Sequence, residues 1–525
     1  MRFGQTRVAG QRHSESKRIL TVFSAVMLAM LIASTNVFMI SPAVPRIVAE
    51  LGGMEYYSWT VASTLLAELV MIPFAGKLSD LYGRKPFYLL GISVFVLGSI
   101  VAGLAPDFWT LVVGRGVQGL GIGAMLPLSQ AVIGDIVSPR ERGKYQGLLD
   151  VTFGVSSTLG APIGGVITDR LSWRYLFYLS VPLGLMAIYV IARFLHVPHV
   201  KRPRSIDYLG AFSLTFGLAA LLLGISFGGN QPAWNSPRTA GLLVAGVLSL
   251  VAFVVVERRA EEPVLPFYLW RNSIFALSNL VSAAIGLALL ASILFIPMFV
   301  QGVLGSNATN SGVILIPMCL SLACVSIASG LLISKTGRYK PVAVTGSIVL
   351  ATSFLLLARM DASTDSFHVV ANMVVVGVGL GMVMQTFTLI VQNAVDRRDL
   401  GVATASLALS RSIGRTVGSA ALGIILAQRL QAEIASRLPV EVYVPGGQSS
   451  AVSSAGALID PGVLAGLPPS VVEAMREGLA ASLQSVFWAV LPVLGLAALA
   501  AALIKEIPLA DSIPPLNQPR SPRAG

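Results

Sequence analysis

Long apolar runs recur along almost the whole chain, and they constrain its fold more than any other feature of the sequence. Hydrophobic residues make up 54% of the 525 residues and charged residues only 12%, about half the charged share of an ordinary soluble protein. Such runs cross a bilayer as helices, because lipid offers no hydrogen-bond partner to an unpaired backbone. The sequence therefore predicts an all-α polytopic membrane protein. We place fourteen spans at residues 19–40, 57–75, 87–104, 108–133, 147–169, 174–194, 208–227, 239–256, 273–299, 311–333, 342–358, 368–391, 402–427 and 481–504.

The basic residues of the loops indicate how these spans are oriented. An even number of spans puts both chain ends on one side of the membrane, and the loops on that side carry most of the Lys and Arg. Because cytoplasmic loops are enriched in these residues, we expect both termini in the cytoplasm of a multi-pass protein of the cell membrane. The net charge of +12 is spread over these short loops, so it indicates orientation and lipid contact, not nucleic-acid binding.

Two related loops suggest an internal duplication. Residues 76–85 read GKLSDLYGRK between two apolar runs, and residues 330–340 read GLLISKTGRYK after another. The glycines permit close backbone approach and a tight turn, and repeated halves are common in transporters. We predict a cytoplasmic N-terminal segment 1–18, six-helix bundles 19–194 and 273–504, an inserted two-helix region 195–272, an extracytoplasmic segment of about 428–480 within the second bundle, and a cytoplasmic tail 505–525.

The first loop resembles the signature loop between helices 2 and 3 of the major facilitator superfamily. The second resembles the copy of that loop in the C-terminal half, with Ser334 where the first has Asp80. By this resemblance, the loop charges pair with the end of the fourth span and hold the cytoplasmic face shut while the protein is open to the outside. The residues of this latch would be Gly76, Asp80, Gly83, Arg84, Lys85 and Asp135.

Arg115 stands inside the fourth span, in the run LVVGRGVQGLG at 111–121. A charge at such depth costs roughly 2.5–3.5 kcal/mol on insertion scales, so Arg115 needs a polar interior and a partner. The run resembles the helix-4 motif of the superfamily, whose Arg is associated with proton coupling. A purely structural Arg, bonded to backbone carbonyls, is the alternative.

The fifth span resembles the antiporter motif of helix 5, which marks exporters rather than importers. Its small residues let membrane helices approach closely, and its proline adds a kink. Two positions depart from the motif, since Ser156 replaces its first Gly and Ala161 its expected Pro. The residues that carry the resemblance are Gly154, Gly160, Pro162, Gly164 and Gly165.

Two further blocks resemble the fourteen-helix drug:proton antiporter family, which is typified by bacterial multidrug exporters. They read LSWRYLFYLSVP at 171–182 and QNAVDRRDLGVAT at 392–404, and the resemblance covers residues 20 to 505. It implies proton-coupled efflux of hydrophobic or amphiphilic compounds by alternating access, with the proton as coupling ion and no cofactor. An importer, or a flippase-like carrier of lipids or another specific amphiphile, is the alternative.

The carboxylate that would carry the proton is not where that family has it, because Asn36 occupies the position. An amide cannot bind and release a proton near neutral pH. Glu68 lies in the middle of the second span, and Arg411 and Arg415, four residues apart, share a face of the thirteenth. Glu68 is roughly 18 Å from the signature loop, and Arg415 is roughly 21 Å from the loop before its own span, so their depths match.

We hypothesise that proton coupling depends on Glu68, with Arg411 or Arg415 as its partner, and on Arg115. A permanent ion pair between Glu68 and Arg415 that only fixes helix packing is the alternative. Asp150, just inside the fifth span, is a second candidate carboxylate. Its position near the cytoplasmic end favours a role in a gate salt bridge.

A cavity between the bundles would combine adaptable Met and Phe side chains with a few polar ones. Few carboxylates are left in the spans to attract cations, so we expect small neutral or amphiphilic substrates rather than strongly cationic ones. The residues predicted to contact substrate are Asn36, Thr64, Gln118, Met125, Gln385 and Gln392. The wider wall would include Met27, Met30, Met39, Gln130, Phe153, Met298, Met382, Met384 and Phe387.

Other classes of function lack their motifs in this sequence. There is no HExxH, no paired Asp-rich motif and no His inside a predicted span for an enzyme or a metal site, and no GxxxxGK[ST] for ATP. Cys319 and Cys324 point in different directions on one predicted helix, which indicates no disulfide. A membrane-embedded enzyme is a distant alternative, and the two-half repeat argues against a channel. We expect a monomer whose partners are the bilayer and a small substrate.

Overall fold

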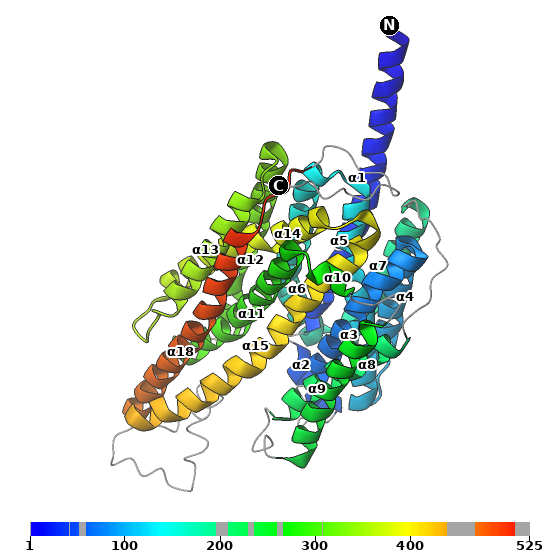
Figure 1. Cartoon of the computed structure of the whole chain (residues 1–525). Coiled ribbons are helices and arrows are strands. Elements are labelled where there is room, and N and C mark those ends of the chain that lie inside the picture. Colours follow the sequence, from blue (N-terminus) through cyan, green and yellow to red (C-terminus); the bar gives the residue numbers. More distant parts are fainter. Residues whose placement is uncertain are drawn as a thin grey trace.

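The computed structural model describes residues 2–40, 43–51, 59–195, 208–228, 236–259, 266–306, 308–437 and 468–509. Within these ranges the chain is almost entirely helical and contains no strand, and fourteen long helices follow the order of the predicted spans (Figure 1). The predicted all-α membrane fold is confirmed. The long helices are α1 (Arg2–Ile40), α3 (Trp59–Tyr82), α4 (Arg84–Gly103), α5 (Phe108–Ile136), α6 (Pro139–Arg170), α7 (Arg174–Phe194), α8 (Tyr208–Gly228), α9 (Pro237–Glu257), α11 (Ser273–Gly302), α12 (Ala308–Thr336), α13 (Lys340–Leu357), α14 (Ser366–Ala394), α15 (Leu400–Arg437) and α18 (Pro469–Leu503).

In the described ranges, three short helices connect them: α2 (Val44–Leu51), α10 (Phe267–Trp270) and the 3-10 helix η4 (Arg397–Asp399). Several long helices extend past the predicted spans, above all α1, α15 and α18. Hydropathy marks only the apolar part of a helix, whereas backbone hydrogen bonding continues until a residue breaks it. Most of the predicted extracytoplasmic segment, residues 438–467, and the tail from residue 510 lie outside the described residues.

Ten of the helices contain a described stretch long and apolar enough to cross a membrane. Glu68, Asp150 and Arg411 lie inside the long helices α3, α6 and α15. Charges inside a membrane bundle are costly and usually mark a functional pathway. The helices that carry these charges are therefore the first place to look for a site.

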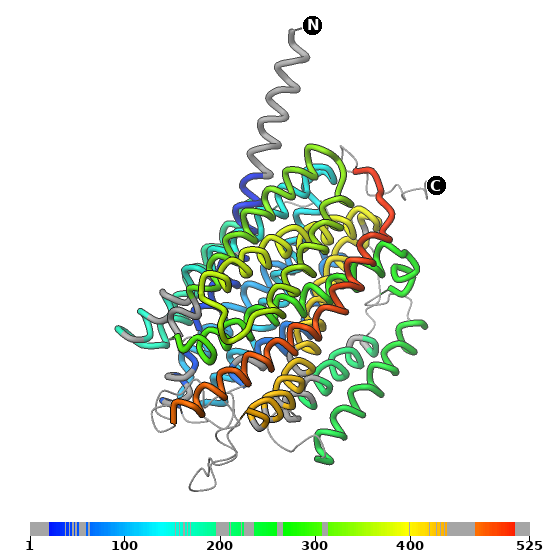
Figure 2. The backbone as a smooth tube through the Cα atoms, turned by 90° about the vertical axis from the view of Figure 1, so that its left-hand side faces the viewer, coloured from blue at the N-terminus to red at the C-terminus, as the bar shows by residue number. Residues whose placement is uncertain are grey.

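The buried side chains divide the bundle into two groups of helices. One core joins α1 and α3 to α7, and a second joins α11 to α15 and α18. Helices α8 and α9 pack on each other at the edge of the bundle, as Figures 1 and 2 show, and contribute to a third core with α3 and α15. We propose that these groups are the predicted halves 19–194 and 273–504, with the inserted pair beside them.

Glycines let neighbouring helices come into backbone contact within the second group. A Cβ at Gly414 of α15 would lie 1.9 Å from the carbonyl oxygen of Ala283 in α11. In the reverse direction, a Cβ at Gly286 of α11 would lie 2.0 Å from the carbonyl oxygen of Arg411. Because α11 and α15 touch in this way, the position of Arg411 is fixed by main-chain packing.

We predict that Gly414→Ala destabilises the protein by roughly 1–3 kcal/mol, because the added methyl group forces these two backbones apart. Gly423→Ala is the matched control, since a Cβ there meets nothing within 4 Å on the same helix. Thermal unfolding of both variants in detergent measures the difference. Equal melting temperatures would show that the contact between α11 and α15 is not tight.

Candidate functional site

A cluster of charges joins the two groups at the end of the bundle where the α3–α4 turn meets α15. Arg84 contacts Asp80 at 2.6 Å and Asp135 at 2.8 Å. The Asp80 carboxylate also accepts hydrogen bonds from the backbone N–H groups of Gly401 (3.2 Å) and Val402 (2.9 Å). These N–H groups belong to the start of α15, where a negative charge is favoured by the helix dipole. We call this end of the bundle the latch face.

The glycines of the loop shape this cluster. Gly83 has a φ of 95°, which only glycine adopts readily, and so permits the sharp turn from α3 to α4. A Cβ on Gly76 would lie 2.4 Å from that of Ala405, so α3 and α15 are in close contact. Burial raises the pKa of Asp80 to about 6, although Arg84 opposes the change. The carboxyl is thus ionised at neutral pH, and its pairing with Arg84 persists there.

Of the six predicted latch residues, Lys85 lies apart from the others. Its amino group donates to the carbonyl oxygen of Ala192 at the end of α7, within the first group of helices. Sequence reasoning missed Arg397, which donates to the carbonyl oxygen of Asp135 at 3.1 Å. The charged run at 396–399 was a signal that could have identified it.

Beneath the latch face, a layer of neutral hydrogen bonds centres on Gln392 of α14. Gln146 of α6 donates to its Oε1 at 2.8 Å, and Gln392 itself donates to the carbonyl oxygen of Gln130 (3.0 Å) and to Thr404 (3.2 Å). This single amide therefore connects α5, α6, α14 and α15. Because its partners belong to both groups, Gln392 holds them together at this level.

Helices α6 and α12 close the other flank of the latch face. A Cβ on Gly330 would lie 2.0 Å from the carbonyl oxygen of Gly143, so the two backbones touch. Arg140 adds a hydrogen bond to the carbonyl oxygen of Ser334 at 3.1 Å. The two groups of helices are thus closed against each other at this end of the bundle.

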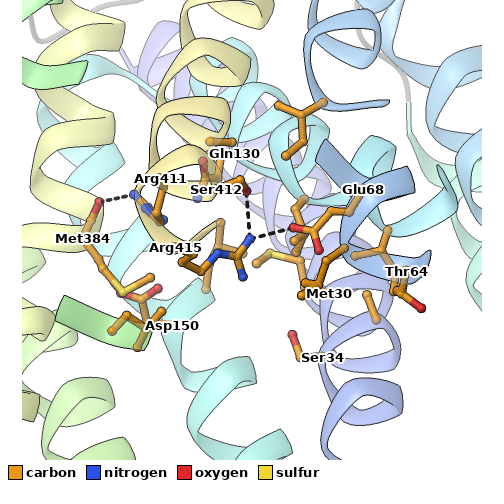
Figure 3. Close-up of a pocket in the computed structure, with 18 of the residues that line it drawn as sticks. Met30, Ser34, Thr64, Glu68, Gln130, Asp150, Met384, Arg411, Ser412 and Arg415 are labelled. Carbon is orange, nitrogen blue, oxygen red and sulfur yellow. Dashed lines mark hydrogen bonds and ion pairs between the residues drawn. The ribbon is translucent and has the colours of Figure 1, made fainter. Parts of the chain in front are cut away.

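A cavity of about 200 Å³ lies between the two groups (Figure 3). Its lining comes from α1, α3, α5, α6, α11, α14 and α15. All five charged residues predicted for proton coupling line it: Glu68, Arg115, Asp150, Arg411 and Arg415. The sequence therefore led to one common site, although it could not show that the five residues meet.

The structure pairs Glu68 with Arg415, one of the two partners proposed from helix depth. The Nη2 atom of Arg415 donates to Oε1 of Glu68 at 3.0 Å and to Ser412 at 2.8 Å (Figure 3). The Glu68 side chain is 8% exposed and that of Arg415 is 30% exposed, so this ion pair is largely removed from solvent. Arg411 instead donates to the carbonyl oxygen of Met384 at 3.2 Å.

Asp150 links α6 to the second group of helices across the cavity wall. Its carboxylate accepts a hydrogen bond from Gln385 of α14 and another from Ser326 of α12, both at 2.6 Å. Asp150 therefore lines the cavity and also bridges the two groups. Its partners are neutral, so the gate salt bridge expected from sequence is not formed in this conformation.

Among the described residues, Arg115 has only neutral hydrogen-bond partners. It donates to the side chains of Asn36 (3.2 Å) and Gln118 (3.0 Å) and to the carbonyl oxygen of Thr60 (3.2 Å). Asn36 in turn donates to Ser180 of α7 at 3.0 Å. This network holds Arg115, which is one of the residues that line the cavity.

The predicted substrate contacts are only partly found in the cavity wall. Thr64 and Gln385 line the cavity, as do Met30, Gln130 and Met384 of the wider set. Asn36 and Gln118 lie behind Arg115, Met125 is fully buried in the core of the first group, and Gln392 lies in the layer beneath the latch face. The remaining described members of the wider set, which also do not line the cavity, are Met27, Met39, Met298, Met382 and Phe387.

The glycine-rich part of α6 packs on two different helices. A Cβ on Gly154 would meet α12 at Ala323, whereas Gly160 and Gly164 face α1 at Phe38 and Met39. Ser156, one of the departures from the motif, bonds Thr35 of α1. The side chains of Phe153, Pro162 and Gly165 lie outside the described residues.

Sequence reasoning missed several cavity residues on α1. Ser34 and Phe38 line the cavity together with the predicted Met30, at spacings of four, so the three share one face of the helix. That spacing was the available signal, but α1 is apolar around most of its circumference and no face stood out.

A bundle of membrane-length helices in two groups, closed at one end around a charged cavity, defines a membrane transporter. The family model described as Major Facilitator Superfamily matches residues 26–419. The multidrug transporter protein MdtP of Bacillus subtilis is 34% identical over 514 residues, which cover 95% of this chain and 95% of MdtP. The chain belongs to the Major Facilitator Superfamily and is a transporter, not an enzyme.

A second relative, Multidrug resistance protein 3 of Bacillus subtilis, is 33% identical over 404 residues, which cover 77% of this chain and 79% of that protein. Among solved structures, the human organic anion transporter MFSD10 (TETRAN) matches with a TM-score of 0.59 and 15% identity. That match covers 90% of this chain and 99% of MFSD10. At this identity the likeness concerns the fold alone.

We predict that Gln392→Leu weakens closure at the latch face by roughly 1–3 kcal/mol, because it leaves buried polar partners unsatisfied. Spin labels at Lys144 and Lys335, exposed residues of α6 and α12, report the separation of the two groups. A population with a longer distance should appear in the variant. Gln484→Leu is the control, since Gln484 bonds the carbonyl oxygen of Met360 within the second group. The same distance distribution in both variants would contradict a closing role for Gln392.

Proposed function

We propose that the protein exports small hydrophobic or amphiphilic compounds in exchange for protons, by alternating access of the central cavity. The observation that supports this most is a largely apolar cavity between two groups of helices with a buried carboxylate–guanidinium pair across it. The names of the two Bacillus subtilis relatives, a multidrug transporter and a multidrug resistance protein, agree with the proposal. We further propose that it acts as a monomer.

The orientation follows from the loop charges. The latch face carries the Lys- and Arg-rich loops and lies at the end of the bundle where α18 ends, so we assign it to the cytoplasm of a plasma-membrane protein. Closure at this face then makes the described conformation outward-facing. Opening requires the separation of Asp80 from the start of α15, of Gln146 from Gln392 and of α6 from α12.

In this proposal Glu68 carries the proton. It sits on α3 of the first group, while Arg415 sits on α15 of the second. In the outward-facing conformation, a proton that enters from the outer side binds Glu68, which removes the charge that holds Arg415 and lets the two groups move apart. The change to the inward-facing conformation carries this proton to the cytoplasmic side, where the lower proton concentration favours its release, so protons move inward as substrate moves outward.

The same movement also breaks the hydrogen bonds of Asp150, on the flank formed by α6 and α12. Its two hydrogen-bond partners, Ser326 and Gln385, belong to the second group, so separation of α6 from α12 and α14 removes both. The carboxylate is then exposed toward the cytoplasmic side and needs new hydrogen-bond donors. We therefore assign Asp150 a supporting role in coupling, and Arg115 and Arg411 the role of fixed positive charges in the cavity.

We predict that Glu68→Gln reduces proton-driven uptake of a fluorescent dye into inside-out vesicles to the background level. The amide still accepts the hydrogen bond from Arg415 but cannot carry a proton. Asp107→Asn is the control, because Asp107 caps the start of α5 outside the cavity, and its uptake should match the wild type. Wild-type uptake by Glu68→Gln would rule out the proton-carrier role.

The double variant Glu68→Gln with Arg415→Gln separates proton carrying from simple packing. Two amides can form a neutral hydrogen bond in place of the ion pair, which removes the cost of an unpaired buried charge. If the pair only holds helices together, the double variant should regain proton-driven uptake. We expect instead a folded protein without proton-driven uptake.

A further inference from the structure

The cavity contains more positive than negative groups. Among the residues that line it in the described parts of the chain, three are arginines and two are carboxylates. Glu68 is paired with Arg415, so these two charges offset each other. Arg115 and Arg411 then face a single further carboxylate, Asp150, whose two oxygens are already occupied by neutral donors.

Arg115 is the cation with the least compensation. Its three hydrogen bonds go to two side-chain amides and one backbone carbonyl, and no described carboxylate lies within ion-pair distance of it. Within the described parts of the chain, the Nε atom of Arg411 is buried without a hydrogen-bond partner and its Nη2 bonds only a backbone carbonyl. Both guanidinium groups line the cavity, so their charge acts on whatever enters it.

We infer that the cavity excludes cations and accepts amphiphiles with an uncharged polar head, and that Asn36 sets this preference by leaving Arg115 without a counter-charge. The amide oxygen of Asn36 lies 3.2 Å from Nη1 of Arg115, where a carboxylate would form an ion pair. Asn36 does not touch the substrate. It acts through Arg115, as a specificity-determining residue.

The choice of an uncharged head over an anionic one rests on the proposed exchange with protons. Exchange requires that the proton and the substrate do not occupy the cavity together. A proton on Glu68 or Asp150 makes the cavity more positive, which strengthens the binding of an anion. An anion would therefore be bound together with the proton, whereas an uncharged head escapes this electrostatic attraction.

The local geometry allows one substitution to place a negative charge beside Arg115. In Asn36→Asp, one carboxylate oxygen keeps the bond from Arg115 that the amide oxygen now accepts. The other oxygen replaces the amide nitrogen that now donates to Ser180. The Ser180 hydroxyl can give up its long 3.5 Å bond to the carbonyl oxygen of Leu176 and donate to this oxygen instead. Asn36→Ser is the control, because it alters the side chain without adding charge.

Three probes with one dansyl-labelled hexyl body and a hydroxyl, trimethylammonium or sulfonate head test the inference. Equilibrium binding to the full-length protein in nanodiscs, without any gradient, gives the affinity ratio of the cationic to the hydroxyl probe. We expect the wild type and Asn36→Ser to bind the cationic probe about tenfold or more weakly, and Asn36→Asp to raise the ratio about tenfold. Equal ratios in all three proteins, or a wild type that prefers the cation, overturn the role of Asn36.

Uptake of the same probes into vesicles with an imposed pH gradient tests the uncharged head. The hydroxyl probe should be driven by the gradient better than the sulfonate probe, and the reverse order overturns this part of the inference. If the gradient drives none of the probes while the binding ratios behave as expected, the proposed proton exchange fails and the exclusion of cations by Asn36 stands.

Discussion

A buried ion pair across the contact between two groups of helices is the interaction on which this structure depends. Removing a carboxylate and a guanidinium from water costs roughly several kcal/mol per ion, and close pairing offsets this only in good geometry. Glu68 and Arg415 meet at 3.0 Å, but they belong to different groups, so the geometry lasts only while the groups stay together. Movement at this contact therefore changes the electrostatic state of the cavity.

The helices that form the cavity also form the latch face. Helix α3 carries both Glu68 and Asp80, and α15 carries both Arg415 and the N–H groups that bind Asp80. On the other flank, α6 carries Asp150 and also the close contact with α12 at Gly143. Because each helix is a rigid element, opening at the latch face cannot leave the pairs in the cavity undisturbed. This shared set of helices supplies the mechanical link that exchange requires.

The depth of residues in the membrane could be predicted from sequence, because helix rise is constant. Counting from the two loops placed Glu68 level with Arg415, and the two are in contact. The rotation of a helix could not be predicted where the span is apolar all round, so Met125 was expected in the cavity but lies in the core. The direction in which the Asn36 side chain points could also not be predicted, since its partners Arg115 and Ser180 come from helices distant in the sequence.

The most direct test of the account is to count the protons released when substrate binds. In weakly buffered solution, saturating hydroxyl probe is added to the purified protein in nanodiscs, and the change in pH gives the number of protons per protein. The account predicts proton release by the wild type and markedly less release by Glu68→Gln. A wild type that binds the probe without releasing protons at any pH where it is folded would contradict the account.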